Sequence, residues 1–168
     1  MFKKQSFAPV VNHNTKLLVL GSLPGEKSLA QNQYYGNSQN RFWLLMSEVL
    51  GVELVALTYP MRLQTLLNNG VGLWDVVAQA HREGSLDSNI RDQTNNDLIS
   101  LITTLPQLTT IAFNGGTAAR IGMKVLGQYA ERYRVIQLPS SSPAYTLTYD
   151  KKLAAWCVLR DQLNTTSR

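Results

Sequence analysis

Cysteine is almost missing from this sequence: Cys157 is the only one in 168 residues. A single thiol cannot form an internal disulfide and cannot supply the ligands of an iron–sulfur cluster. Long hydrophobic runs are missing as well. None approaches the roughly 18 apolar residues of a bilayer-spanning helix, and the N-terminus lacks the long apolar core of a signal peptide. We therefore expect a cytoplasmic protein that does not insert into a membrane.

Dense runs of positive charge are also missing, although the net charge is +5 and the pI is about 9.5. A basic protein favours a polyanionic partner, but scattered charges do not form a nucleic-acid-binding tail.

His81, Glu83 and Asp87 lie close together in the sequence, but they lack a recognisable spacing of zinc ligands. The sequence therefore indicates no metal site and no other cofactor.

The sequence contains enough apolar material for a buried core. Hydrophobic residues make up 44% of the chain, and a chain of this length suits one well-buried domain but is short for two. No linker, repeat or low-complexity segment interrupts it. We expect a single domain over residues 1–168 that acts as a monomer.

Apolar periodicity in the first half predicts one strand and two helices. The apolar run at 16–22 is bounded by turn residues and predicts a buried strand. Apolar residues at helical spacing predict helices over 42–50, where a glycine follows the last apolar position, and over about 60–67. The stretch 68–77, NNGVGLWDVV, mixes turn residues with a short apolar piece. Its Asp75 is interpreted as a cap for a following helix, and the weaker alternative is a residue that lines a pocket mouth or contacts DNA.

The second half alternates more plainly. Helices are predicted over 98–105, 115–127 and about 149–163, and strands at 108–113 and 133–138. Strands that alternate with helices favour an α/β domain whose mainly parallel sheet is covered by helices on both faces. The expected fold is therefore a three-layer α/β/α sandwich.

Ligands of such sheets gather beyond the carboxyl ends of the strands. Three loops follow predicted strands: GSLPG at 21–25, FNGG at 113–116 and LPSSSPAY at 138–145. A phosphate-cradling loop of a nucleotide-binding protein is one interpretation of GSLPGEKS. The loop lacks the G-x-x-x-x-G-K-[ST] pattern, because its glycines are too close and no lysine–serine pair comes directly after the second one. That interpretation is therefore the weaker one.

Together the loops resemble the uracil-DNA glycosylase superfamily, and in particular its hypoxanthine-DNA (deoxyinosine) glycosylase branch. That branch shows a first motif GSxPG…S…YY…NxFW and a second motif LPSxSPA. This sequence has GSLPGEKSLAQNQYYGNSQNRFW at 21–43 and LPSSSPAY at 138–145, with FNGG between them. The resemblance covers most of the chain and agrees with the fold expected from periodicity.

The resemblance implies a reaction. A glycosylase of this kind flips a damaged base out of DNA and hydrolyses its N-glycosidic bond, which leaves a free base and an abasic site. The implied substrate is DNA that contains deoxyinosine, and uracil-containing DNA is the runner-up. A catalytically silent DNA-binding module is the non-enzymatic alternative.

Asn40 is the catalytic residue that the resemblance implies, because it matches the asparagine of NxFW. In the mismatch-specific branch a GxNPG loop carries a catalytic asparagine, but Leu23 stands at that place here, and leucine can neither position water nor accept a proton. A structural role for Asn40 stays open, because an asparagine before an amphipathic helix is a favoured N-cap. The two roles are compatible if the helix start aims the amide into the pocket.

Base-binding residues are also implied by the resemblance. Asn114 lies where uracil-DNA glycosylases place an asparagine that reads the base edge, and its amide can pair with N1–H and O6 of hypoxanthine. Tyr35 matches an aromatic residue that stacks on the flipped base, a contact worth roughly 1 to 3 kcal/mol. Gly21 and Ser22 complete the expected base pocket. Local sequence alone also suits a turn role for Asn114 and core packing for the tyrosine.

The second motif is the expected contact with the DNA backbone. The residues predicted to bind DNA are Ser140, Ser141, Ser142, Pro143 and Tyr145. Serine hydroxyls and backbone N–H groups suit phosphates, and the tyrosine or the alanine before it is expected to fill the gap that the flipped base leaves. Classical uracil-DNA glycosylases have a histidine in the equivalent loop; this loop has none, so we do not expect leaving-group stabilisation by histidine. Without the first motif, a Ser-Pro cluster is a routine turn.

Overall fold

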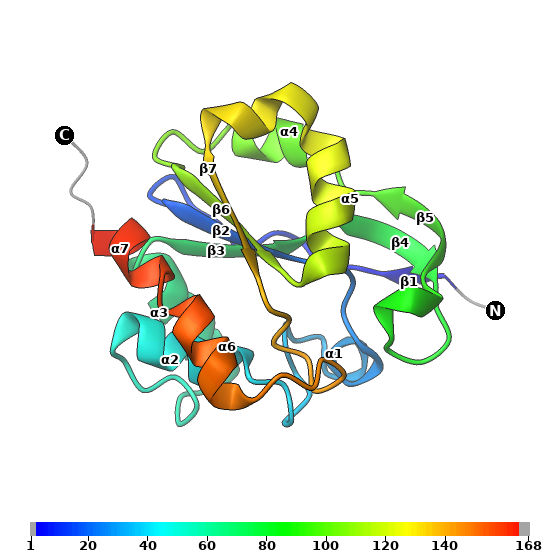
Figure 1. The fold of residues 1–168 in the computed structure, drawn as a ribbon, viewed down its shortest axis with the longest axis horizontal. Helices are drawn as coiled ribbons and strands as arrows, with labels where there is room; N and C mark the ends of the chain where they lie inside the picture. Colours follow the sequence, from blue (N-terminus) through cyan, green and yellow to red (C-terminus); the bar gives the residue numbers. More distant parts are fainter. Residues whose placement is uncertain (1–2, 165–168) are drawn as a thin grey trace.

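A sheet of four parallel strands positions the three loops. The computed structural model describes residues 3–164, and its main sheet has the order β3-β2-β6-β7 (Figure 1). Its strands are β2 Leu17–Gly21, β3 Val71–Asp75, β6 Thr110–Asn114 and β7 Arg134–Leu138. In this register Gly21 lies beside Asp75, and Asn114 lies beside Leu138. The parallel sheet agrees with the predicted fold class and brings the loops to one edge.

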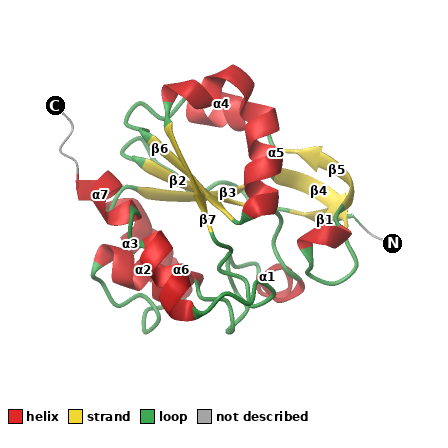
Figure 2. Cartoon of the chain, viewed as in Figure 1, coloured by secondary structure: helices red, strands yellow, loops and turns green. Residues whose placement is uncertain are grey.

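Helices cover both faces of this sheet (Figures 1 and 2). The helices on one face are α4 Leu98–Ile102 and α5 Gly116–Leu126. Those on the other are α2 Phe42–Leu50, α3 Tyr59–Asn68, α6 Tyr149–Trp156 and α7 Leu159–Asn164. The short segment η2 Gly127–Arg132 continues α5 and adds Ala130 to the apolar cluster beneath α4 and α5. Two short helical segments lie outside the two layers: α1 Glu26–Gln31 and η1 Asp87–Asn89. The layers confirm the predicted sandwich.

None of the helices between residues 3 and 164 combines the length and the apolar character needed to span a membrane.

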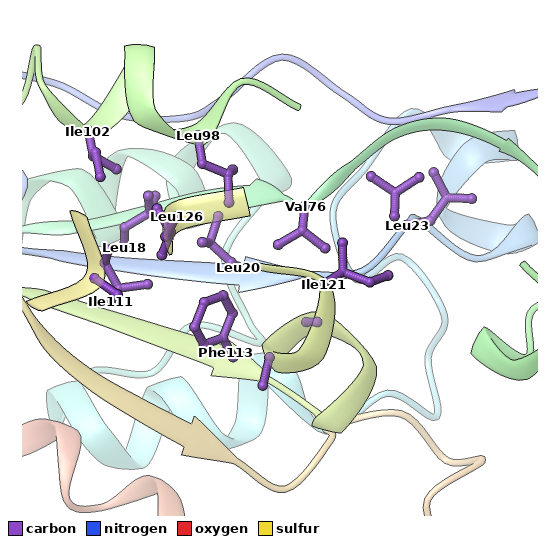
Figure 3. Close-up of a cluster of buried hydrophobic side chains, with 14 of the residues drawn as sticks. Leu18, Leu20, Leu23, Val76, Leu98, Ile102, Ile111, Phe113, Ile121 and Leu126 are labelled. Atoms are coloured by element: carbon purple, nitrogen blue, oxygen red, sulfur yellow. The ribbon is translucent and has the colours of Figure 1, made fainter. Parts of the chain in front are cut away.

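The alternating side chains of β2 explain why the sheet is covered twice. Leu18 and Leu20 belong to the cluster beneath α4 and α5, together with Phe113 (Figure 3), whereas Leu17 and Val19 belong to the cluster beneath α2 and α6. All five side chains are fully buried. Successive side chains of a strand face opposite sides, so a strand that is apolar throughout belongs in the middle of a covered sheet.

The sequence analysis does not predict the second, smaller sheet. This sheet is antiparallel, has the order β1-β4-β5, and consists of β1 Lys4–Gln5, β4 Val77–His81 and β5 Arg91–Asn95. Every residue of β5 is exposed, so this strand has no apolar alternation to reveal it. Only Val76 separates β3 from β4. No helix follows Asp75, and its interpretation as a helix cap is therefore wrong.

Two helices end differently from the prediction. α4 stops at Ile102, where the hydroxyls of Thr103 and Thr104 donate to carbonyls of the preceding turn at 3.0 and 2.6 Å. These bonds satisfy carbonyl groups that a longer helix would have paired. The helix predicted over 149–163 is two helices, α6 and α7, which are separated by residues 157–158 and both pack on α2.

Candidate active site

A cavity lies at the edge of the sheet where the three loops meet. Its volume is about 370 Å³, and its wall comes from the ends of β2, β3 and β6, from the segments that follow β2, β6 and β7, and from the loop around η1. It is lined by every residue predicted for the site: Gly21, Ser22, Tyr35, Asn40, Asn114, Ser140, Ser141, Ser142, Pro143 and Tyr145. The fold therefore brings both motifs to one cavity.

Asn40 lies one residue before Arg41, the N-cap position of helix α2, and its side chain caps the helix start from there. Its Oδ1 accepts a hydrogen bond of 2.9 Å from the N–H of Phe42, the first helical residue. The side chain is half-buried at the cavity wall, and its amide nitrogen donates to no other residue in the described part of the chain. The oxygen is thus held by the helix start while the nitrogen stays available to a ligand, so the capping role leaves room for the predicted catalytic role.

The two motifs are joined by hydrogen bonds around Ser141. The N–H of Arg41 donates to the Ser141 carbonyl at 3.0 Å. Asn114 binds the same serine with both ends of its amide: Nδ2 donates to Ser141 Oγ and Oδ1 accepts from the Ser141 N–H, each at 2.9 Å. Asn114 and Ser141 are both buried. Asn114 therefore fixes the second-motif loop, a role that the sequence analysis did not assign to it.

This contact restricts what Asn114 can offer a ligand. A side-chain amide carries two N–H groups and two oxygen lone pairs. Ser141 uses one of each, so one donor and one acceptor remain. Base reading by Asn114 stays a prediction, limited to these remaining sites.

The serine loop holds its hydroxyl oxygens as acceptors. Ser140 Oγ accepts from the N–H of Ser142 at 3.1 Å, and Ser142 Oγ accepts from the N–H of Ala144 at 3.2 Å. The hydroxyl protons remain available to an anion. Lys152 is buried behind the loop, where its Nζ donates to the Ser142 carbonyl at 3.0 Å. Tyr145 extends from the loop and is 49% exposed.

Tyr35 lines the cavity with its ring already stacked on a neighbour. Its ring lies 3.9 Å from that of Phe42 at an interplanar angle of 16°, and its φ of +54° is in the left-handed region. The phenol oxygen is buried and has no hydrogen-bond partner among the described residues. Burial raises the pKa of this phenol, the charge of Asp75 adds to the rise, and the nearby Asn114 amide opposes it without forming a hydrogen bond of ordinary geometry.

Asp75 is a cavity residue for which the sequence analysis favoured a structural role over a place at the pocket. It ends β3, is 3% exposed and lines the cavity. Burial raises the pKa of its carboxyl to about 7; the negative charge of Asp87 adds to the rise, and Arg82 opposes it. A carboxylate directly after an apolar run was the available signal. The signal has meaning only when the run is known to be a strand beside β2.

Ser22 belongs to a charged cluster beside the cavity. Its Oγ donates to Asp87 Oδ1 at 2.6 Å, and Arg82 Nη1 lies 3.6 Å from the same oxygen. Arg82 is buried and also donates to the carbonyls of Leu23 and Pro24. Burial lowers the pKa of the guanidinium, and nearby carboxylates oppose that change. This cluster ties the GSLPG loop to the β4–β5 connection and engages the Ser22 hydroxyl.

Known proteins match almost the whole chain. The family model described as the Uracil DNA glycosylase superfamily matches residues 8–161. The chain belongs to the uracil-DNA glycosylase superfamily. It is accordingly a DNA glycosylase, an enzyme of DNA repair whose substrate is damaged DNA.

Two curated relatives extend this similarity. One is named Hypoxanthine DNA glycosylase, from Methanosarcina barkeri, and is 38% identical over 159 residues, which are 92% of this chain and 96% of the relative. The other carries the same name, comes from Methanosarcina acetivorans, and is 42% identical over 141 residues, which are 84% of this chain and 87% of the relative.

A solved structure agrees in fold. It is the solution NMR structure of a candidate uracil DNA glycosylase from Methanosarcina acetivorans, with a TM-score of 0.86 and 37% sequence identity. The match covers 98% of this chain and 100% of that one.

Two features of related glycosylases, the asparagine of the GxNPG loop and the histidine of the second-motif loop, have no counterpart at this cavity. Leu23 is 6% exposed and packs in the cluster beneath α4 and α5 (Figure 3), so the GSLPG loop contributes a core contact at this position. Of the described residues that line the cavity, none is a histidine. Nor do the described residues include a group of three or more His, Cys, Asp and Glu that could hold a metal ion.

Proposed function

We propose that this glycosylase is a monofunctional hypoxanthine-DNA glycosylase that flips deoxyinosine out of DNA and hydrolyses its N-glycosidic bond. One observation carries the proposal: Asn40, with a free amide nitrogen, and the Asn114–Ser141 pair line the same cavity. The names of the two curated relatives favour hypoxanthine as the base.

Asn40 is the proposed catalytic residue. Breaking the glycosidic bond develops positive charge on the sugar and negative charge on the departing base, so the attacking water must be oriented and the base must receive hydrogen bonds. The Asn40 oxygen keeps a second lone pair beyond the one used by Phe42. Together with the free amide nitrogen, it suits a water molecule that attacks the sugar. The bond to Phe42 fixes the amide in advance, which reduces the entropy lost on reaching the reactive geometry.

Asn114 and Tyr35 are proposed to bind the flipped base. The donor and the acceptor that Asn114 retains beside Ser141 suit N1–H and O6 of hypoxanthine. Tyr35 is held flat against Phe42, and a rigid ring of this kind suits stacking on a base. Gly21 and Ser22 lie at the same wall.

The serine loop is proposed to bind the DNA backbone. The hydroxyl protons of Ser140 and Ser142 suit phosphate oxygens. Tyr145 projects from this loop into solvent at the cavity mouth, a position that suits the gap left by a flipped base. Pro143 lies between Ser142 and Tyr145, and its fixed φ stiffens the turn.

We propose that the enzyme works as a single-domain monomer in the cytoplasm and needs neither metal nor cofactor. Uracil is the second candidate base, because its N3–H and O4 present the same donor and acceptor to Asn114.

A substrate panel tests the proposal. Duplexes that each contain one hypoxanthine, uracil, xanthine or normal base are incubated with excess enzyme, and abasic sites are then cleaved with alkali. We expect fastest cleavage at hypoxanthine and none at normal bases. Faster excision of uracil would transfer the assignment to the second candidate, and cleavage of none of them would refute the proposed function.

A further inference from the structure

Two buried side-chain polar atoms in the described part of the chain have no hydrogen-bond partner, and both belong to residues that line the cavity. They are the phenol oxygen of Tyr35 and Oδ2 of Asp75. A buried polar atom without a partner costs roughly 1 to 3 kcal/mol. Two such atoms at one place indicate a site that is completed by a ligand.

Gly21 is the residue that leaves room for these atoms. It is the register partner of Asp75 at the ends of two neighbouring parallel strands. A Cβ at this position would lie 2.7 Å from Asp75 Oδ1 and 3.2 Å from the Tyr35 phenol oxygen. Any side chain at position 21 would therefore displace the carboxyl group. With glycine there, the carboxyl and the phenol occupy the space above the end of β2.

Four titratable groups face the Asp75 carboxyl: Tyr34 and Tyr35 from the segment after α1, Arg82 from the end of β4, and Asp87 from η1. The guanidinium of Arg82 is used elsewhere, because it donates to backbone carbonyls and pairs with Asp87. The pKa of Asp75, which burial and Asp87 raise to about 7, leaves a large protonated fraction near neutral pH.

Asp87 and Glu26, the other two acids that line the cavity, are less suited to deliver a proton. Glu26 is exposed and its carboxylate lies 3.4 Å from Lys4 Nζ. Burial raises the pKa of the Asp87 carboxyl as well. Its Oδ1 accepts from Ser22 and lies close to Arg82, and both contacts oppose that rise by favouring the ionised form. The asparagines and serines of the cavity can donate hydrogen bonds but are not proton donors at neutral pH.

A departing purine needs such a proton. When the bond between C1′ and N9 breaks, N9 takes the electron pair, and the base leaves as an anion unless a ring nitrogen is protonated. An acid whose pKa lies near the working pH is the most effective donor.

We propose that Asp75 is a general acid of this enzyme and donates its carboxyl proton to N3 or N7 of the departing hypoxanthine. The inference rests on the proposed function. The proton moves from Asp75 to the base as the C1′–N9 bond breaks, and water adds to C1′ and releases one proton. That proton, or one from solvent, restores the Asp75 carboxyl, so the net reaction consumes one water molecule.

The test compares single-turnover excision of hypoxanthine by the wild-type protein, Asp75→Asn and Asp161→Asn from about pH 5 to about pH 8.5. The amide keeps the size and a hydrogen-bond donor of the protonated carboxyl but cannot transfer a proton. Asp161 is exposed on α7 and is the matched control. Circular dichroism and affinity for deoxyinosine duplex verify that each variant folds and binds.

We expect the wild-type rate to fall about tenfold per pH unit above about pH 7. Asp75→Asn should bind the duplex within about threefold of wild type, excise hypoxanthine at least about 100-fold more slowly at pH 6, and show no such fall. The control should match the wild type. If Asp75→Asn does not fold, titration of the carboxyl by NMR in the wild type, set against the wild-type rate profile, takes its place.

Three results would overturn the inference: an Asp75→Asn rate near that of the wild type, a slow variant that keeps the wild-type pH profile, or a carboxyl that titrates far from the kinetic pKa. Each of them leaves hypoxanthine excision by the wild type intact. Failure of the wild type to excise hypoxanthine at any pH would instead refute the proposed function, so the two failures are distinguishable.

Discussion

Asn114 and Ser141 form a closed pair of hydrogen bonds between the end of β6 and the second-motif loop, with Nδ2 to Oγ and N–H to Oδ1 both at 2.9 Å. Both residues are buried. The pair therefore sets the position of the loop that is proposed to meet DNA, and the amide that is proposed to read the base is oriented by the same contact.

Replacing Asn114 by alanine should damage stability and excision together. The change removes both bonds and leaves the buried Ser141 N–H without a partner, so we expect a loss of roughly 2 kcal/mol in the free energy of unfolding. Single-turnover excision should fall as well. Denaturant unfolding measures the first effect. The control is Asn68→Ala, whose side chain makes an exposed hydrogen bond on α3 and should change stability by less than about 0.5 kcal/mol. An Asn114→Ala protein of unchanged stability would contradict the role of this pair.

Asn40→Ser separates the capping role from the catalytic role. Serine is also a favoured cap, so the bond to the Phe42 N–H has a substitute and the melting temperature should stay nearly unchanged. Single-turnover excision should fall roughly 100-fold or more, because the shorter hydroxyl cannot hold the attacking water as the amide does. Gln39→Ser, an exposed change one residue earlier, should be neutral. Near-normal excision by Asn40→Ser would leave Asn40 as a cap alone.

Salt should weaken DNA binding, because phosphate contacts release counterions. Lys27 is exposed and lines the cavity mouth. Fluorescence anisotropy at several salt concentrations should show that Lys27→Ala reduces the slope of log Kd against log salt by about 0.9. Lys124→Ala, on the last turn of α5, should leave the slope unchanged. Binding that is indifferent to salt would contradict the proposed backbone contacts.

Asp75 should make stability depend on pH. Its carboxyl pKa is raised from 3.8 to about 7 in the folded protein, so folding favours the protonated form. The stabilisation that comes from the protonated carboxyl is fully present below about pH 4 and is lost as the pH rises to about 7. Above that pH the free energy of unfolding changes no further through this group. The pKa of Asp87 is raised as well and acts with the same sign.

The variant Asp75→Asn isolates this effect. It should gain stability relative to the wild type as pH rises from about 5 to about 8, by up to a few kcal/mol, because each pKa unit corresponds to 1.36 kcal/mol. Thermal unfolding across this range measures the difference. A constant difference between the two proteins at all pH values would show that the carboxyl has no raised pKa.

The elements that could be predicted from sequence are those with an apolar signal of their own. β2 and β6 are buried throughout, and α2 and α5 carry apolar stripes that end at glycines. β5 is polar and fully exposed, and its pairing with β4 depends on chain geometry that no local pattern records. The antiparallel sheet could therefore be found only in the structure.

The candidate site divides in the same way. Asn40 and the serine loop could be named because their motifs are contiguous in sequence. Asp75 could be weighed only as the weaker of two interpretations, because its role comes from the register that places it beside Gly21. The double contact between Asn114 and Ser141 joins residues 27 positions apart and likewise depends on tertiary structure.

The most direct test is to identify the product released from a duplex that carries one deoxyinosine, with enzyme in excess and a chelator present. Chromatography with mass spectrometry measures the free base, and gel electrophoresis before and after alkali measures the strand. The account predicts one free hypoxanthine per duplex and a strand that stays intact until alkali cleaves it at the abasic site. Absence of free hypoxanthine from folded, DNA-binding protein would contradict it.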